Sequence, residues 1–435
     1  MASEMTLESH TTPYRLGTPA EMRIIVACGI GTALEWFDFV AYAMFAPTIA
    51  RTFFPTANEL TSMLATFGAF TAGFVMRPLG ALLLGNYADS SGRKAALSAS
   101  ILLMALGTGL MAIIPGYSRI GIAAPLLITC ARLIQGLSAG GEVGCAFSFL
   151  AEHAPPSRRA YFTSWQQASV GLFYILAGTV GFALTATLTP QQIESWGWRV
   201  PFILGMAIAP VGFYIRSTLP ESPVFTRTPV KRAHHLPVVE LLTRHFGQFL
   251  VGTGLTLCWA VCSQLINYMP TYTVRDLGMS RTNAFLGFLV VGTILMASPM
   301  IGRYADYVGR RTLMRGAAIG MLLLTYPLFA LVTSRPSVGP FIATQCILSF
   351  LLLLYSAPAA AALAEQYPTS VRSSGVALSY SAATTLFGSV TPVVSLLLVN
   401  ATANKAAVAY YLMAAAALSL VALAFMKDRT GESLS

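Results

Sequence analysis

Gly85-Asn-Tyr-Ala-Asp89-Ser-Ser-Gly92-Arg93-Lys94 returns 217 residues later as Gly302-Arg-Tyr-Ala-Asp306-Tyr-Val-Gly309-Arg310-Arg311. In both copies one long apolar run precedes the stretch and another follows it. This arrangement predicts a short basic loop between two membrane-spanning helices, in which the second glycine allows a tight turn. Two copies half a chain length apart indicate an internal duplication, which in a helical membrane protein is typical of transporters.

The composition independently favours a membrane protein. Of the 435 residues, 55% are hydrophobic and only 10% are charged, whereas a soluble protein carries about 25% charged residues. The net charge of +10 comes from bases spread over short loops. Because they form no basic face with interleaved aromatic residues, the sequence predicts no nucleic-acid partner.

Twelve apolar segments each approach the roughly 20 residues that a helix needs to cross a bilayer. They lie at about 23–50, 60–86, 95–114, 121–150, 162–188, 198–217, 246–272, 282–302, 312–332, 338–364, 374–400 and 406–426. The prediction is an all-α membrane protein with 12 transmembrane helices in two pseudo-symmetric six-helix halves. The expected parts are an N-terminal tail (1–22), a first half (23–217), a linker (218–245), a second half (246–426) and a C-terminal tail (427–435).

The distribution of basic residues predicts the orientation. If both termini are cytoplasmic, 18 of the 27 Lys and Arg residues fall in inner loops and tails and 7 fall in outer loops. The positive-inside rule therefore favours cytoplasmic termini and places both repeated loops inside.

A second repeat marks the inner helix ends. Ala151-Glu152-His-Ala-Pro155-Pro-Ser-Arg-Arg159 is echoed 213 residues later by Ala364-Glu365-Gln-Tyr-Pro368-Thr-Ser-Val-Arg372. We expect the acids and bases of both repeats to form an inner gate between the halves; the alternative is simple anchoring of the loops. The predicted gating residues are Asp89, Arg93, Asp306, Arg310, Glu152, Arg159, Glu365 and Arg372.

The repeated loops resemble the signature of the major facilitator superfamily. Glu35-Trp-Phe-Asp38-Phe, Met76-Arg77-Pro-Leu-Gly80 and Arg132-Leu-Ile-Gln135-Gly-Leu-Ser-Ala-Gly140-Gly-Glu142 resemble its metabolite:proton symporter family. Tyr161-Phe-Thr-Ser-Trp165-Gln166 and Trp196-Gly-Trp198-Arg-Val-Pro201 are similar to its citrate-type carriers. One departure is Tyr355-Ser-Ala-Pro358, where those carriers have a polar Tyr-Asn-Gly.

The resemblance implies a secondary active symporter that brings a di- or tricarboxylate into a bacterial cell with protons, through the inner membrane, by alternating access. The partners are then the small-molecule carboxylate, protons and membrane lipid. No cofactor is expected. A monomer suffices, because one chain contains both halves.

Five charged residues stand well inside apolar runs, all in the first half: Glu35, Asp38, Arg77, Arg132 and Glu142. Each costs roughly 2.5–3.5 kcal/mol at the bilayer centre unless it has a partner or a wet cavity. Helical spacing places Glu35, Asp38 and Tyr42 on one face of the first segment. We expect these acids to meet the arginines of the second and fourth segments.

Chemistry divides these residues into two roles. An arginine offers a carboxylate a planar two-point fit and stays charged, so Arg77 and Arg132 are the predicted substrate ligands. An acid shielded from water holds its proton more firmly and can exchange it near neutral pH, so Asp38 and Glu35 are the predicted proton carriers, with Glu142 a candidate that could equally serve packing or gating. The alternative is a static ion-pair network that only fixes the helices.

Neutral side chains complete the predicted substrate site. For these the alternative is helix packing or an interfacial aromatic anchor. They are Tyr42, Gln135, Gln166, Asn267, Tyr268, Tyr272 and Tyr355.

The sequence lacks the motifs that several other functions require. The chain has no Gly-Lys-Ser/Thr phosphate loop for ATP-driven transport. We find no nucleophile and base, and no cluster of metal ligands, at one depth, so neither an enzyme nor a metal site is predicted. Two alternatives within transport stay open, namely symport of another organic acid and symport of a zwitterionic osmolyte such as betaine or proline.

Overall fold

A computed structural model describes residues 19–91, 93–217, 241, 243–368 and 371–432, which form helices and the connections between them. Each of the twelve predicted segments coincides with a helix, or with helices that meet at a break. The first group comprises α1 (Pro19–Met44), α2 (Ala46–Phe53), α3 (Glu59–Val75), α4 (Arg77–Ser91), α5 (Arg93–Ile113), α6 (Tyr117–Ile120), α7 (Ala123–His153), η1 (Pro156–Arg158), α8 (Arg159–Thr187), α9 (Pro190–Ser195), η2 (Gly197–Arg199) and α10 (Val200–Ser217). The second comprises α13 (Phe246–Arg275), α14 (Arg281–Leu295), α15 (Ser298–Val308), α16 (Arg310–Ser334), α17 (Val338–Glu365), α18 (Arg372–Ala383), η3 (Thr384–Gly388), α19 (Thr391–Thr402), η4 (Lys405–Ala407) and α20 (Val408–Phe425).

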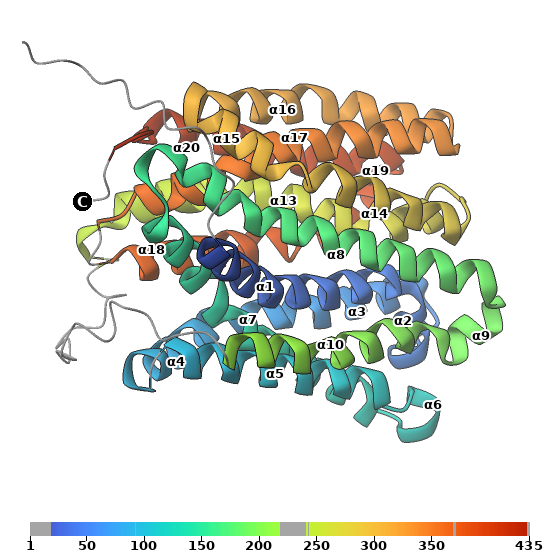
Figure 1. Cartoon of the computed structure of the whole chain (residues 1–435). Coiled ribbons are helices and arrows are strands. Elements are labelled where there is room, and N and C mark those ends of the chain that lie inside the picture. The colour runs from blue at the N-terminus through green and yellow to red at the C-terminus, as the bar shows by residue number, and fades with distance from the viewer. Residues whose placement is uncertain (1–18, 92, 218–240, 242, 369–370, 433–435) are drawn as a thin grey trace, which may run out of the picture.

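The long helices run side by side along one direction (Figure 1). Within the described residues, eight helical stretches are long and apolar enough to cross a membrane, and α14 with α15, bent by 44°, would make a ninth. The predicted spans outside this set coincide with α1, α5 and α10. We call the end of the bundle with residues 302–311 and the C-terminal residues the motif end; it lies at the left in Figure 1. The opposite end, with α2, α6 and α9, is the far end.

The two groups of helices pack against each other along two seams. On one side α8 lies against α14, α15 and α17. On the other, α3, α4 and α7 lie against α18 and α19. The contact of α1 with α13 joins the groups between these seams. The two-group arrangement agrees with the predicted pair of halves, whereas the linker prediction (218–245) falls mostly outside the described residues.

A proline break couples the two groups at mid-height. Pro78 has no N–H, so it cannot donate to the carbonyl of Phe74 one turn earlier. The hydroxyl of Thr385, in the π-helical segment η3 of the other group, donates to that carbonyl at 2.9 Å. Nearby, Thr71 of α3 donates to the carbonyl of Ser389 at 3.0 Å. Side-chain hydroxyls of each irregular helix thus donate hydrogen bonds to backbone carbonyls of the other where they meet. The break also places Arg77 at the start of α4.

Two glycines of α7 allow close approach to α3 and α4. A β-carbon on Gly136 would lie 1.6 Å from the carbonyl oxygen of Gly73, and one on Gly140 would lie 1.9 Å from that of Arg77. The small-residue spacing of this helix therefore serves packing, as membrane helices commonly use it. The contact at Gly140 presses the backbone of Arg77 against α7, the helix that carries Arg132.

Candidate functional site

An ion pair inside the first group joins α1 to α7. The Asp38 carboxylate accepts a hydrogen bond from Nη1 of Arg132 at 2.9 Å, and both side chains are almost completely buried. The Arg132 guanidinium also lies over the ring of Tyr42, 3.9 Å from its centroid. The predicted face of α1 therefore contacts the arginine of the fourth predicted segment.

The other edge of the same guanidinium is unused. Nε and Nη2 of Arg132 are buried and have no hydrogen-bond partner among the described residues. These two N–H groups point in parallel, in the geometry that holds both oxygens of a carboxylate. Buried donors are normally paired, and leaving one unpaired costs about 1–3 kcal/mol. The edge is thus chemically suited to an anionic ligand.

A polar chain from α5 and α7 holds the Asp38 carboxylate from behind. Thr108 donates to Oδ1 of Asp38 at 2.9 Å, and the Gln135 amide donates to the Thr108 hydroxyl at 3.1 Å. The Thr108 hydroxyl favours the ionised acid, and Gln135 orients that hydroxyl. Gln135 was predicted as a substrate ligand, and here its NH₂ group is instead engaged with Thr108.

A second ion pair lies between α1 and α4. Nη2 of Arg77 donates to the Glu35 carboxylate at 2.6 Å, with side chains 2% and 1% exposed. The guanidinium packs over Phe74, 4.1 Å from the ring centroid, and over Phe39 at 5.0 Å. The helix that carries Arg77, α4, also packs against α18 of the second group. This pair therefore faces the boundary between the groups, while the pair of Asp38 and Arg132 lies within the first group.

A pocket inside the first group borders Asp38. It is lined by Asp38, Ile101, Met104, Ala105, Thr108, Glu142, Gly205 and Ala209. Glu142 is buried and shares this pocket with Asp38. The third deep acid thus lies near the first ion pair.

The neutral candidates divide into two sets. Asn267 of α13 accepts a hydrogen bond from Tyr174 of α8 at 2.6 Å and so bridges the two groups. The ring of Tyr268 packs against that of Phe67 in α3, with the ring centroids 5.8 Å apart, and this contact also crosses the boundary. Gln166 is buried on α8.

The remaining two tyrosines donate hydrogen bonds within the second group. The Tyr355 hydroxyl donates to the carbonyl of Leu255 at 2.7 Å, within the second group. The Tyr272 hydroxyl donates to the carbonyl of Lys405 at 3.0 Å, also within that group.

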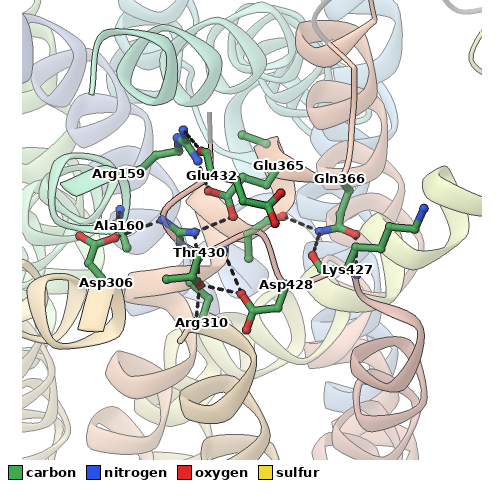
Figure 2. Close-up of polar contacts among 12 residues, drawn as sticks. Arg159, Ala160, Asp306, Arg310, Glu365, Gln366, Lys427, Asp428, Thr430 and Glu432 are labelled. Atoms are coloured by element: carbon green, nitrogen blue, oxygen red, sulfur yellow. Dashed lines mark hydrogen bonds and ion pairs between the residues drawn. The ribbon is translucent and has the colours of Figure 1, made fainter. Parts of the chain in front are cut away.

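Charged residues join the groups at the motif end (Figure 2). The Glu365 carboxylate accepts hydrogen bonds from Arg159 of the first group and from Arg310 of the second, the latter at 2.7 Å. Asp306 pairs with Arg310 at 3.1 Å. The same carboxylate accepts from the backbone N–H groups of Ala160 and Tyr161, each at 3.0 Å. Asp306 of one group therefore caps the first turn of α8 in the other, where a negative charge also complements the helix dipole.

Of the four other predicted gating residues, the structure describes the side chain of one. Arg372 donates to the carbonyl of Ala364 at 3.2 Å, a contact within its own group. The side chains of Asp89, Arg93 and Glu152 lie outside the described part of the structure. Gly309 has φ +95°, in the region that favours glycine, as the tight turn of the repeated loop predicts.

The far end has a different chemistry. Phe45 of the first group contacts Phe285 of the second, with ring centroids 5.9 Å apart. Met44, Pro47, Thr48, Pro270, Val274 and Ala284 line a pocket with these two rings. The described contacts between the groups are thus ionic at the motif end and aromatic here.

Sequence reasoning missed two residues that contribute to the site. Thr108 and Tyr174 are hydroxyl residues inside apolar runs, and neither differs in pattern from a threonine or tyrosine that only packs. Only the helix arrangement brings them to Asp38 and Asn267. Among the described residues, no group of three or more His, Cys, Asp or Glu side chains could hold a metal ion.

Paired six-helix groups, buried ion pairs at mid-height and an ionic contact between the groups at one end define a secondary transporter of the major facilitator superfamily. The chain belongs to the family described as Sugar (and other) transporter, which matches residues 24–235 and 230–435. Its relatives include citrate-proton symporters, as its motifs predict.

The relatives cover almost the whole chain. A citrate-proton symporter from Klebsiella pneumoniae is 36% identical over 434 residues, covering 98% of this chain and 97% of that protein. A glycine betaine/proline/ectoine/pipecolic acid transporter from Dickeya dadantii (strain 3937) is 32% identical, covering 95% of this chain and 84% of that protein. Among solved structures, a proton:xylose symporter bound to 6-bromo-6-deoxy-D-glucose has a TM-score of 0.76 at 17% identity, covering 95% of this chain and 97% of that one. That last likeness supports the fold alone.

Proposed function

We propose that this chain is a proton-coupled symporter that brings a di- or tricarboxylate into a bacterial cell. The observation that carries the proposal is the unpaired, buried Nε and Nη2 edge of Arg132, beside an acid that already occupies Nη1. A carboxylate fits that edge with two parallel hydrogen bonds. The citrate-proton symporter relative supports the same substrate class.

Coupling follows from the charge of each ion pair. With Asp38 ionised, the pair with Arg132 is neutral overall. A proton on Asp38 leaves one uncompensated positive charge in a dry site, where an anion is attracted far more strongly than in water. Glu35 and Arg77 act in the same way at the boundary between the halves. Proton binding therefore prepares both arginines for substrate carboxylates.

The remaining roles follow position. Asn267, Tyr268, Gln166 and Tyr42 shape the site, and Gln135 acts through Thr108. Glu142 exchanges the proton with Asp38 through the pocket that they share. Tyr272 and Tyr355 contribute by packing.

Transport proceeds by alternating access. The halves, 23–217 and 246–426 with a linker at 218–245, rock about the mid-height site. The network of Asp306, Arg310, Arg159 and Glu365 closes the cytoplasmic side, with both termini in the cytoplasm. Asp89, Arg93, Glu152 and Arg372 take part from the duplicated positions. The protein works as a monomer in the inner membrane without a cofactor, and it catalyses no chemical reaction.

The alternative substrate class is a zwitterionic osmolyte or another organic acid, which the betaine and proline transporter relative favours. Two buried arginines favour the carboxylate, because a zwitterion brings its own positive charge. The deciding experiment is uptake of labelled citrate into proteoliposomes driven by a pH gradient. Succinate, tricarballylate, 2-oxoglutarate, shikimate and betaine serve as unlabelled competitors.

Two outcomes separate these readings. Uptake that an uncoupler abolishes and that only the polycarboxylates block supports the carboxylate assignment. If citrate is not taken up and betaine or shikimate is transported instead, the alternative replaces that assignment.

A further inference from the structure

The residues after α20 lie across the ionic network of the motif end. We define Met426–Glu432 as the C-terminal strap. Gln366 exchanges two hydrogen bonds with the backbone of Lys427, at 3.0 and 3.2 Å. Arg311, the last base of the second repeated loop, donates to the carbonyls of Leu423 and Ala424 at 2.8 and 2.6 Å. The start of the strap is therefore fixed to the second half.

The middle of the strap forms a turn against Arg310. The Asp428 carboxylate accepts from the hydroxyl of Thr430 at 2.6 Å and from its N–H at 3.2 Å. The backbone N–H of Arg310 donates in turn to the Thr430 hydroxyl at 3.4 Å. Arg310 also binds Glu365, so the strap contacts one of the two arginines that share this carboxylate.

The end of the strap reaches the first half. Nη2 of Arg159 donates to the backbone carbonyl of Glu432 at 3.0 Å, while Nη1 of the same guanidinium pairs with Glu365 (Figure 2). Arg159 is 1% exposed. Two separate segments of the second half, α17 and the strap, therefore hold one arginine of the first half.

We propose that the strap is a component of the gate and stabilises the state that is closed at the motif end. Opening this end separates Arg159 from Glu365 and, in the same movement, from the Glu432 carbonyl. A hydrogen bond to a charged donor that forms in only one state shifts the equilibrium toward that state by about tenfold. The inference rests on the proposed alternating-access cycle, but not on which substrate is carried.

The test measures opening directly, without substrate. Ser164 is buried on α8 at the motif end, where it faces Gly302 of α15, and Thr48 is buried in the aromatic pocket of the far end. Ser164→Cys and Thr48→Cys are introduced separately into protein whose six cysteines have been replaced. The rate at which a water-soluble maleimide labels each cysteine in proteoliposomes then reports opening at that end.

The main variant is a chain that ends after Arg429, which keeps the Lys427 anchor and removes the contacts of Thr430 and Glu432. We expect Ser164→Cys to be labelled about tenfold faster in this variant, with no increase at Thr48→Cys. Thr430→Val, at full length, should move the same rate in the same direction by a smaller factor. This full-length variant tests the strap if the shortened chain does not fold.

Glu432→Ala is the matched control, because Arg159 binds the backbone carbonyl and the substitution leaves that carbonyl in place. Its labelling rates should equal those of the parent. Unchanged labelling at Ser164→Cys in both strap variants would overturn the proposal, and so would equal acceleration at both ends, which indicates general loosening. Failure of citrate uptake would leave these labelling results unaffected.

Discussion

Asp38 and Arg132 face each other across α1 and α7, with a carboxylate oxygen 2.9 Å from Nη1. The Nε and Nη2 groups of the same guanidinium make no hydrogen bond with the described residues. One arginine is thus half occupied by an internal acid and half available to a ligand. A proton on the acid changes the charge of this unit without any movement of the backbone.

Asp38→Asn tests the proton role. The amide has a similar shape but cannot gain or lose a proton in this pH range, so we expect accumulation driven by a pH gradient to be lost completely. Exchange of internal for external substrate should persist, because exchange needs no net proton movement. Labelled-substrate uptake and counterflow in proteoliposomes measure the two activities. Retained accumulation would remove Asp38 from the coupling mechanism.

Arg77→Lys tests the substrate role at the boundary between the halves. Lysine keeps the charge but lacks the planar fork and the stacking over Phe74. Loss of one charge-assisted, two-point contact should weaken apparent substrate affinity by about 10–100-fold. The concentration dependence of uptake gives the affinity. Arg51→Lys, at an exposed surface pair with Glu194, is the control and should leave it unchanged.

Thr108→Val tests the polar chain behind Asp38. The lost hydroxyl had stabilised the carboxylate, so the acid will hold its proton up to a higher pH. The pH at which uptake falls to half its maximum should therefore rise. Thr108→Ser keeps the hydroxyl and should restore the parent profile. A profile that does not move with Val would limit Thr108 to packing.

Glu365→Gln tests the ionic network at the motif end. The change leaves Arg159 and Arg310 facing a neutral amide in a buried place, which should destabilise the protein by about 3 kcal/mol. Thermal unfolding of the purified protein in detergent measures the loss. Glu194→Gln, in a pair that is 43% and 60% exposed, should cost less than about 1 kcal/mol. Equal effects of the two substitutions would contradict a structural role for the network.

Gly140→Ala tests the contact between α7 and α4. The added carbon would meet the carbonyl of Arg77 at 1.9 Å, so the helices must separate and displace both arginines. We expect lower thermal stability and at least a tenfold loss of uptake. Gly68→Ala is the matched control, because nothing lies within 4 Å of the added carbon. Normal uptake by Gly140→Ala would show that the close approach is dispensable.

The ion pairs illustrate how far sequence reasoning reaches. Helical spacing put Glu35, Asp38 and Tyr42 on one face, and the insertion penalty of a charge required partners for the acids. It did not decide which arginine serves which acid. The pairing depends on the rotation and depth of α4 and α7, which the break at Pro78 and the contact at Gly140 set.

The neutral residues show the opposite case. Tyr268 and Tyr355 look alike as tyrosines within apolar segments, yet one contacts Phe67 across the boundary and the other bonds to Leu255 within its own half. The C-terminal residues carry no pattern at all that predicts a contact with Arg159. Such contacts join residues far apart in the chain, and local periodicity holds no information about them.

The sequence by itself determined the membrane class, the duplication, the helix positions and the set of charges that must be buried together. It could do so because a bilayer allows few structures and penalises every unpaired charge. The tertiary structure alone decided the pairing of each acid, the free edge of Arg132, the capping of α8 by Asp306 and the course of the strap. Those features depend on distances of a few ångströms between helices, and only packing fixes them.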